Sequence, residues 1–394
     1  MKNLEQDKLD VTRKERSNMF DWRGQFTPDF IEYMLSCFSK PGMTIADPFL
    51  GSGTVLLESI RKGLPCIGYE LNPSAFFMSK FFEYAKLDKE KRGVLLSRFD
   101  SLIDTLLSSY SKDLPVYTKS DDYRVSYCHL LSFAKDVKNN STKADWPFLI
   151  NVLFLCEKDK KKSLYDSIRG NYAIMKNNLL SLPVAANKVE VYLGDARSLG
   201  GAFPQSIDLI LTSPPYINVF NYHQNYRGII ECFDFDVLKV AESEFGSNRK
   251  NRTNRFRTVV QYTMDMGDTI LSASKSLVVN GRIVLVVGRV SKVRNTPFYN
   301  SKIIESIIEI IPELKIEGRS ERQFMNRFGE IIVEDIIIAT KVSPSESNLS
   351  SSVFKELGLQ QISDAISYAD SSVKEELMDV IVNSDKIHVS PLNQ

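Results

Sequence analysis

Short runs of apolar residues alternate along the chain with segments in which apolar residues recur every three or four positions. Residues 283–287 form a continuous aliphatic run, and residues 207–211 form another that only Asp208 interrupts. Such runs are typical of strands that are buried on both faces of a parallel sheet. An amphipathic helical pattern follows over residues 301–311, and a further apolar run over residues 331–339. The pattern predicts an α/β fold with an open, mostly parallel sheet.

The stretch between the second and third predicted strands departs from this alternation. Its apolar residues recur at helical spacing, as at Leu95, Phe99 and Leu102, and charged connectors separate the helical patterns. A plain Rossmann-like domain would need only one crossover helix there, so we expect a mainly helical insertion. After the last strand we expect a serine-rich linker and a short tail. The predicted division of the chain is residues 1–80, 81–187, 188–341 and 342–394.

The segment from Ser213 to Tyr216 has the sequence Ser-Pro-Pro-Tyr and directly follows a predicted strand. Open α/β folds bind their ligands beyond the C-terminal ends of the strands. Two prolines make a stiff loop without backbone donors, so the Ser213 hydroxyl and the Pro214 carbonyl can both accept hydrogen bonds. Such acceptors can hold the hydrogens of an exocyclic amino group, while Tyr216 stacks on the base that carries it. The same string also fits a plain proline-rich strand exit with a capping serine.

A second candidate site is the glycine loop after the predicted strand at residues 43–47. Gly51 and Gly53 allow a tight turn and a close approach to a ligand, and Thr54 begins a predicted helix. Neither the third glycine of a dinucleotide signature nor the lysine of a P-loop follows. The next predicted strand ends at Glu70, where a carboxylate can accept both hydroxyls of a ribose. Alone, Glu70 would be an ordinary solvated charge at a strand end.

Four motifs together resemble those of the DNA methyltransferases that use S-adenosylmethionine to methylate amino groups. They are Asp47-Pro-Phe-x-Gly-Ser-Gly-Thr54, Gly68-Tyr-Glu70, Gly194-Asp195-Ala-Arg197 and Thr212-Ser-Pro-Pro-Tyr216. Residues 281–288 and 330–341 resemble the later strands of this family. The resemblance implies a Rossmann-like, seven-stranded class I methyltransferase sheet with the helical insertion, in which the cofactor-binding half comes first and the catalytic half second.

The resemblance also implies roles for single residues. Asp47 and the glycine loop would hold the amino-acid part of S-adenosylmethionine, Glu70 its ribose and Asp195 its adenine amino group. A segment similar to the family's Phe-x-Pro would contact the methionine end. The cofactor-binding residues expected in this way are Phe26, Thr27, Pro28, Asp47, Pro48, Phe49, Gly51, Gly53, Thr54, Glu70, Asp195 and Ala196. The expected catalytic residues are Ser213, Pro214, Pro215 and Tyr216.

Ser213, the first residue of the catalytic motif, indicates which base is the target. Serine at this position is typical of the cytosine-N4 members of the family, so N4 of a flipped cytosine is the expected target and adenine N6 stays open. An RNA or protein amino methyltransferase is a further alternative, although such relatives usually have Asn or Asp before the prolines. A non-enzymatic DNA-binding subunit on the same fold is another, and the intact glycine loop argues against it.

Two segments beyond the catalytic motif are candidates for contact with double-stranded DNA. Residues 217–227 interleave aromatic and amide side chains next to the catalytic loop, which suits a flipped base. Residues 248–257 contain several basic side chains and no acid, which suits phosphate contacts, although a charge run is usually a solvated surface. The residues expected to bind DNA are Asn218, Tyr222, Arg249, Arg252, Arg255 and Arg257.

Composition agrees with an enzyme of this kind. The chain has 394 residues, 43% of them hydrophobic, and 50 Lys and Arg against 49 Asp and Glu. Because the net charge is near zero, any affinity for DNA must come from local patches. No long apolar run and no signal-peptide pattern occurs, so we expect a cytoplasmic protein without a membrane anchor. A cognate restriction endonuclease is the family's common partner, and the sequence itself contains no sign of one.

The cysteines and histidines do not fit a zinc site, a disulfide framework or a cysteine nucleophile. Five cysteines and three histidines lack the spacing of a zinc site or of a disulfide framework, so no metal is expected. The dipeptide Pro65-Cys66 resembles the nucleophile of cytosine-C5 methyltransferases, but it precedes the second predicted strand rather than following the catalytic one. Methylation of an amino group also needs no covalent adduct, so we exclude Cys66 as a nucleophile.

Overall fold

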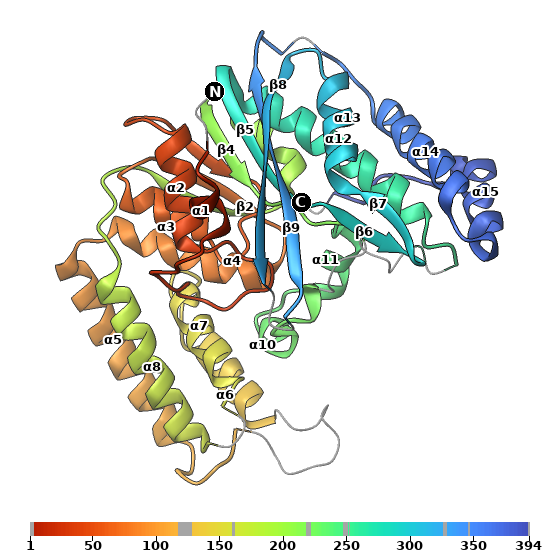
Figure 1. Cartoon of the computed structure of the whole chain (residues 1–394). Helices are drawn as coiled ribbons and strands as arrows, with labels where there is room; N and C mark the ends of the chain where they lie inside the picture. The colour runs from red at the N-terminus through yellow and green to blue at the C-terminus, as the bar shows by residue number, and fades with distance from the viewer. Residues whose placement is uncertain are drawn as a thin grey trace.

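The computed structural model is built around one seven-stranded mixed sheet with the strand order β3-β2-β1-β4-β5-β9-β8 (Figure 1). Strands β1 to β5 run parallel, and β9 is antiparallel to both of its neighbours. The Rossmann-like, seven-stranded fold that the sequence predicts is therefore confirmed. The structure describes residues 4–116, 128–159, 162–217, 222–246, 251, 253–325, 329–345 and 347–392. The strands are β1 (Ile45–Asp47), β2 (Cys66–Glu70), β3 (Val189–Leu193), β4 (Ile207–Thr212), β5 (Leu277–Gly288), β8 (Leu314–Met325) and β9 (Ile331–Lys341), and a separate ribbon consists of β6 (Val290–Val293) and β7 (Thr296–Tyr299).

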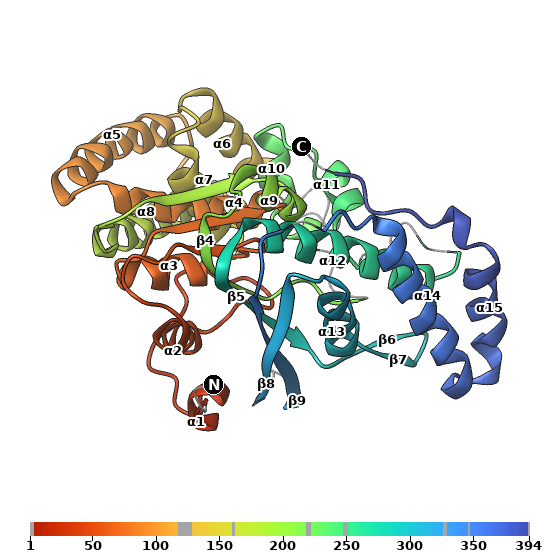
Figure 2. The ribbon, with the colours of Figure 1, turned by 90° about the horizontal axis from the view of Figure 1, so that it is seen from above.

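Alternate residues of each central strand point to opposite faces of the sheet. Because the side chains on both faces are apolar, helices cover both faces. In β5, Val284 and Val286 enter one hydrophobic core, whereas Ile283 and Leu285 enter the other. Figure 2 shows α3 on one side of the strands and α12 on the other. The first core includes helices α2 (Pro28–Phe38), α3 (Thr54–Arg61) and α4 (Pro73–Lys80), and the second includes α12 (Arg257–Ser276) and α13 (Asn300–Ile310). Short helices elsewhere are α1 (Gln6–Asp10), α9 (Leu199–Ala202), α10 (Arg227–Cys232) and α11 (Val237–Ser243).

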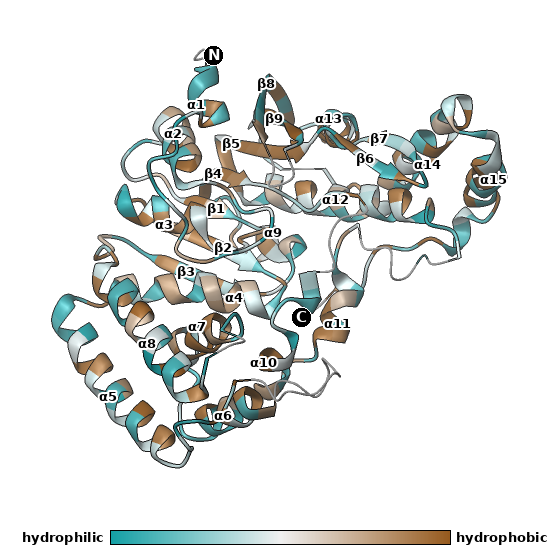
Figure 3. Cartoon of the chain, turned by 60° about the horizontal axis from the view of Figure 1, so that its bottom comes forward, coloured by the Kyte–Doolittle hydropathy of each residue, from teal (hydrophilic) through white to brown (hydrophobic). Residues whose placement is uncertain are grey.

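Four α-helices are described between α4 and β3, in the stretch where the sequence predicts an insertion. They are α5 (Lys89–Ser108), α6 (Cys128–Asn139), α7 (Trp146–Cys156) and α8 (Leu164–Ser181). Helix α7 is apolar on all sides and almost entirely buried (Figure 3), as expected of a helix at the centre of a bundle. No helix in the described part of the chain is long and apolar enough to cross a membrane.

A buried arginine fixes this bundle to the rest of the domain. Arg92 of α5 is completely buried, and such a cation needs partners for its donors. Its guanidinium donates to backbone carbonyls of the 3-10 helix after α4 and of the last turn of α8 and the residues that follow it, namely those of Tyr84, Ala85, Leu179, Leu182 and Pro183. Polar contacts thus hold α5 to α8 and to the segment after α4, in addition to the shared hydrophobic core.

The end of the chain packs on α12 instead of forming a loose tail. Helices α14 (Ser351–Tyr368) and α15 (Lys374–Val382) follow β9, and Phe354 of α14 is completely buried. Glycine on both helices allows a close approach: a Cβ atom on Gly267 of α12 would lie 2.1 Å from the Phe354 ring, and one on Gly358 would lie 2.8 Å from the Val260 backbone. The region after residue 342 is therefore part of the second hydrophobic core.

This close packing predicts opposite effects of two Gly→Ala substitutions. Alanine normally stabilises a helix interior by about 0.5–1 kcal/mol relative to glycine, and Gly93→Ala in α5 should do so because its Cβ would meet no atom within 4 Å. Gly267→Ala should instead destabilise the protein by about 1–3 kcal/mol, because the new methyl group overlaps Phe354. Urea unfolding of the two variants measures this. A Gly267→Ala protein as stable as Gly93→Ala would contradict the packing.

Candidate active site

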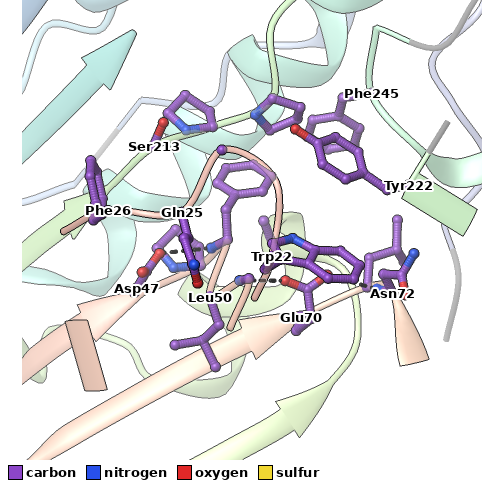
Figure 4. Close-up of a pocket in the computed structure, with 18 of the residues that line it drawn as sticks. Trp22, Gln25, Phe26, Asp47, Leu50, Glu70, Asn72, Ser213, Tyr222 and Phe245 are labelled. Carbon is purple, nitrogen blue, oxygen red and sulfur yellow. Dashed lines mark hydrogen bonds between the residues drawn. The ribbon is translucent and has the colours of Figure 1, made fainter. Parts of the chain in front are cut away.

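A pocket opens at the C-terminal edge of the parallel strands, at the ends of β1, β2, β3 and β4 (Figure 4). The glycine loop and the Ser213–Tyr216 loop, far apart in sequence, form facing parts of its wall. The segment before α2 and the N-terminal part of β9 complete it. The lining residues are Trp22, Arg23, Gly24, Gln25, Phe26, Asp47, Pro48, Phe49, Leu50, Gly51, Thr54, Val55, Glu70, Leu71, Asn72, Gly194, Asp195, Ala196, Ser213, Pro214, Pro215, Tyr216, Tyr222, Glu244, Phe245 and Glu334.

Asp47 connects the two loops. It ends β1, is buried, and its Oδ1 accepts hydrogen bonds from Thr212 Oγ1 (2.6 Å) and from the Phe49 N–H (3.0 Å). Thr212 is the last residue of β4 and directly precedes Ser213. Burial raises the pKa of Asp47 to about 7, since the few donors around it only partly replace its hydration. The carboxyl group thus fixes the glycine loop relative to the Ser213–Tyr216 loop.

Glu70 holds the glycine loop from the other side. It ends β2, and its two carboxylate oxygens accept hydrogen bonds from the Gly51 N–H (2.7 Å) and the Asn72 N–H (2.8 Å). Burial, with Asp47 close by, raises its pKa to about 7. Each oxygen keeps a second lone pair, so Glu70 can still accept hydrogen bonds from the hydroxyls of a ligand.

Three of the residues predicted to bind the cofactor do not line the pocket. Gly53 has φ +86°, and a Cβ atom there would lie 2.8 Å from the Phe82 ring, so this glycine serves the turn into α3. Thr27 is the N-cap of α2 and Pro28 is its first residue, whereas Phe26 reaches the pocket. The structure brings together the other nine: Phe26, Asp47, Pro48, Phe49, Gly51, Thr54, Glu70, Asp195 and Ala196.

Asp195 lies in the wall with most of its acceptor capacity already used. Its Oδ1 accepts from the backbone N–H of Arg197 (2.9 Å) and from Arg197 Nε (2.9 Å), and its Oδ2 accepts from Arg197 Nη2 (2.6 Å). A carboxylate offers about four lone-pair positions. One position on Oδ2 therefore remains for a donor of a ligand, such as an amino group.

The Ser213–Tyr216 loop is fixed by a carboxylate that the sequence did not suggest. Tyr216 Oη donates to Glu334 Oε1 (2.8 Å) and lies 3.3 Å from Ser213 Oγ. Glu334 of β9 is in turn paired with Arg322 Nε (2.7 Å). Burial, together with Glu334, raises the pKa of Tyr216 well above its ordinary value. The ring lies against Gly288, where a Cβ atom would be 2.8 Å away, so its plane is set by β5 and β9.

Two aromatic rings cover the part of the pocket above Glu70 (Figure 4). Trp22 and Tyr222 are stacked, with ring centroids 5.9 Å apart and an interplanar angle of 18°. Ser52 Oγ donates to Gln25 Oε1 (2.5 Å), which holds the segment before α2 on the glycine loop. Tyr222 was predicted to contact DNA, and the structure places it in this pocket.

The other predicted DNA contacts are only partly described. Asn218, Arg249 and Arg252 lie outside the described residues. Arg255 is exposed, and Arg257 Nη2 is paired with Asp379 Oδ2 of α15 (2.9 Å). The roles of these residues in binding DNA stay predictions.

Sequence reasoning missed several pocket residues. Glu334 and Asp335 interrupt the apolar run of β9, which is a signal that could have been used. Glu244 accepts hydrogen bonds from both the backbone N–H and Nδ1 of His223 (2.9 Å each), and no motif marks it or Phe245. Among the described residues, no group of three or more His, Cys, Asp or Glu side chains is placed to hold a metal ion.

Comparison with known proteins tests the family resemblance that the sequence motifs suggest. A family model described as DNA methylase, of the N6 and N4 type, matches residues 5–81. The type II methyltransferase M.MjaII of Methanocaldococcus jannaschii is 20% identical to this chain, over 82% of the chain and 81% of the relative. The resemblance to the amino-group DNA methyltransferases is confirmed. The family model covers residues 5–81, and the alignment with M.MjaII extends over 82% of the chain.

Solved structures of methyltransferases are also similar to this chain. A SAM-dependent methyltransferase of Methanosarcina mazei aligns over 78% of this chain and 97% of its own, with 11% identity and a TM-score of 0.35. An rRNA methylase of Streptococcus thermophilus aligns over 79% of this chain and 95% of its own, with 8% identity and a TM-score of 0.31.

The raised pKa of Glu70 predicts that the effect of Glu70→Gln on the free energy of unfolding changes with pH. Its pKa is about 7 in the folded protein against an ordinary value of 4.5, so wild-type stability falls as the pH rises through this interval. Glu70→Gln lacks this dependence. The free energy of unfolding of the variant minus that of the wild type should therefore rise between pH 5 and 7 by up to ~1.4 kcal/mol per pH unit.

Urea unfolding at pH 5, 6, 7 and 8 checks this difference. The matched control is Glu90→Gln, at an exposed position of α5. A Glu70→Gln difference that is the same at pH 5 and pH 8 would show that the carboxyl group is not held protonated by burial.

Proposed function

We propose that this chain transfers the methyl group of S-adenosylmethionine to the exocyclic amino group of a flipped base in double-stranded DNA, with N4 of cytosine as the target. The family resemblance supports amino-group DNA methylation in general. Ser213 as the first residue of the catalytic motif favours cytosine N4 over adenine N6. A cognate restriction endonuclease belongs to the proposal only through the common setting of the family.

One observation carries the proposal. The hydrogen bond from Thr212 to Asp47 spans 165 positions of sequence and brings the glycine loop and the catalytic loop to one pocket. A methyl donor on the first loop and an amino group on the second would then be in contact. Positioning of this kind is the main contribution that a protein can make to a direct displacement.

The pocket suits a cationic nucleoside. Five acidic side chains line it, and Arg23 is the basic residue among the lining residues that are described. The acids are Asp47, Glu70, Asp195, Glu244 and Glu334. Arg197 and Arg322 compensate the charges of Asp195 and Glu334, and a cation in the pocket would favour the ionised forms of Asp47 and Glu70. S-adenosylmethionine is such a cation, and its sulfonium supplies an electrophilic methyl group when the cofactor is bound. Glu70 would accept the ribose hydroxyls, and the remaining acceptor position of Asp195 would take an amino hydrogen of the adenine.

The catalytic loop supplies the acceptors for the target. Ser213 Oγ and the Pro214 carbonyl would hold the two hydrogens of the amino group, which directs the nitrogen lone pair toward the cofactor side of the pocket. Tyr216 would stack on the base, with its ring plane fixed by Glu334 and Gly288. The stacked rings of Trp22 and Tyr222 would limit the access of water. After transfer, the methylated nitrogen loses one proton to water.

The decisive experiment is to sequence DNA from cells that express the protein in a background without other methylases. The method must distinguish N4-methylcytosine from N6-methyladenine, and we expect N4-methylcytosine at one short recognition sequence. N6-methyladenine instead would overturn the target base, and unmodified DNA would overturn the proposed activity.

Ser213→Ala tests the role of the hydroxyl. Loss of one preorganised hydrogen bond to the reacting group should lower the rate of methyl transfer by about 10²–10³-fold, while the affinity for S-adenosylmethionine in calorimetry stays within about twofold of the wild type. Ser206→Ala, just before the other end of β4, is the matched control because Ser206 Oγ only donates to the Phe203 carbonyl (3.0 Å). A wild-type rate for Ser213→Ala would exclude this role.

A further inference from the structure

The end of the chain reaches the candidate active site. After α15 the chain turns back toward α9 and α11 (Figure 2), and we call its last described part, residues 387–392, the C-terminal segment. Ile387 and Ser390 are buried, and the carbonyl of His388 accepts from Gln261 Nε2 of α12 (3.0 Å). The segment is therefore a fixed part of the structure.

Ser390 binds a buried carboxylate of α12. Its backbone N–H donates to Asp265 Oδ1 (2.8 Å), and its hydroxyl donates to Asp265 Oδ2 (2.6 Å). The Asp265 side chain is completely buried. A buried carboxylate is tolerated only where donors or a cation compensate for lost hydration. Ser390 supplies two of those donors, and Arg197 Nη1 (3.3 Å) supplies a third.

All five N–H donors of Arg197 are used, and two of them bind the C-terminal segment. Nη1 donates to the Ser390 carbonyl (2.8 Å) and to Asp265, and Nη2 donates to the Pro391 carbonyl (3.1 Å). The remaining donors, Nε and the second hydrogen of Nη2, bind Asp195. Because a guanidinium is planar and rigid, the partners that bind one edge determine where the donors of the opposite edge point.

Arg197 also forms the rear of the pocket wall. Its guanidinium lies over the Phe245 ring, 5.1 Å from the centroid, and Phe245 packs edge-on against Phe49 at 5.7 Å. Asp195, Phe245 and Phe49 all line the pocket, and the side chain of Arg197 is only 5% exposed. A displaced guanidinium would thus change the wall on which one end of a bound ligand rests.

We infer that Arg197, Asp265 and Ser390 are positioning residues of the cofactor site, and that the C-terminal segment is required for full affinity for S-adenosylmethionine. Without the segment, two buried donors of Arg197 lose their partners and Asp265 loses two donors. The guanidinium then reorients toward Asp265 or toward water, and the carboxylate of Asp195 is no longer held for the adenine. This inference rests on the proposed function, because it takes Asp195 to contact the adenine of the cofactor.

Three variants and a control test the inference. Ser390→Ala removes one hydrogen bond to a charged group and should weaken binding of S-adenosylmethionine about tenfold. A chain truncated after Lys386 should lose at least as much affinity. Ser390→Thr keeps the hydroxyl and should restore binding to within about twofold of the wild type. Tyr368→Phe is the control, because it removes a hydrogen bond to the Pro297 carbonyl (3.1 Å) within the same C-terminal region but away from Arg197.

Each protein is examined by calorimetry with S-adenosylmethionine, by fluorescence anisotropy with duplex DNA in the absence of cofactor, and by thermal unfolding. We expect the affinity for S-adenosylmethionine to fall while that for DNA stays unchanged. Wild-type cofactor affinity in both Ser390→Ala and the truncated chain would overturn the inference, and so would a parallel loss of cofactor affinity, DNA affinity and melting temperature in both. If the wild type itself does not bind S-adenosylmethionine, the proposed function fails instead.

Discussion

The buried hydrogen bond between Thr212 and Asp47 is the constraint on which the site depends. It joins the last residues of two adjacent parallel strands, β1 and β4. The loops that follow these two strands therefore begin at fixed positions relative to each other. Asp47 has few partners, and burial raises its pKa to about 7. The position of the glycine loop relative to Ser213 is therefore set within the sheet before any ligand binds, which is the preorganisation that methyl transfer needs.

Four of the five acids of the pocket fall into two groups that differ in their partners, and the fifth, Glu244, accepts hydrogen bonds from His223. Asp195 and Glu334 are each paired with an arginine behind the pocket wall, at 2.6 and 2.7 Å, and these pairs hold the wall in place. Asp47 and Glu70 accept hydrogen bonds from neutral groups instead, and burial raises both pKa values to about 7. A cation in the pocket would lower these values again. The unpaired acids thus form the part of the site that responds to charge, while the paired acids determine its shape.

Most of the pocket residues that the sequence located follow parallel strands, and several that do not were missed. Asp47, Glu70 and Ser213 were found because the C-terminal ends of adjacent parallel strands meet at one edge of a sheet. Glu334 lies near the start of β9, which is antiparallel, and it reaches the same edge only through its pairing with Gly288. The position of Glu334 opposite Gly288 follows from the pairing of β9 with β5, and no local sequence pattern predicts it. Aromatic residues close to the motif, such as Tyr222, gave no information on whether they face DNA or the cofactor.

The C-terminal region shows why a segment without a recognisable motif can still matter to the site. Phe354 fills the space that Gly267 leaves on α12, so α14 fixes the helix that carries Asp265. Asp265 and the C-terminal segment then determine how Arg197 meets Asp195. Each of these contacts is buried and specific, and together they form a continuous path from the last helices to the pocket wall. A serine-rich segment is typical of a linker, but the buried residues beyond it are part of the second hydrophobic core.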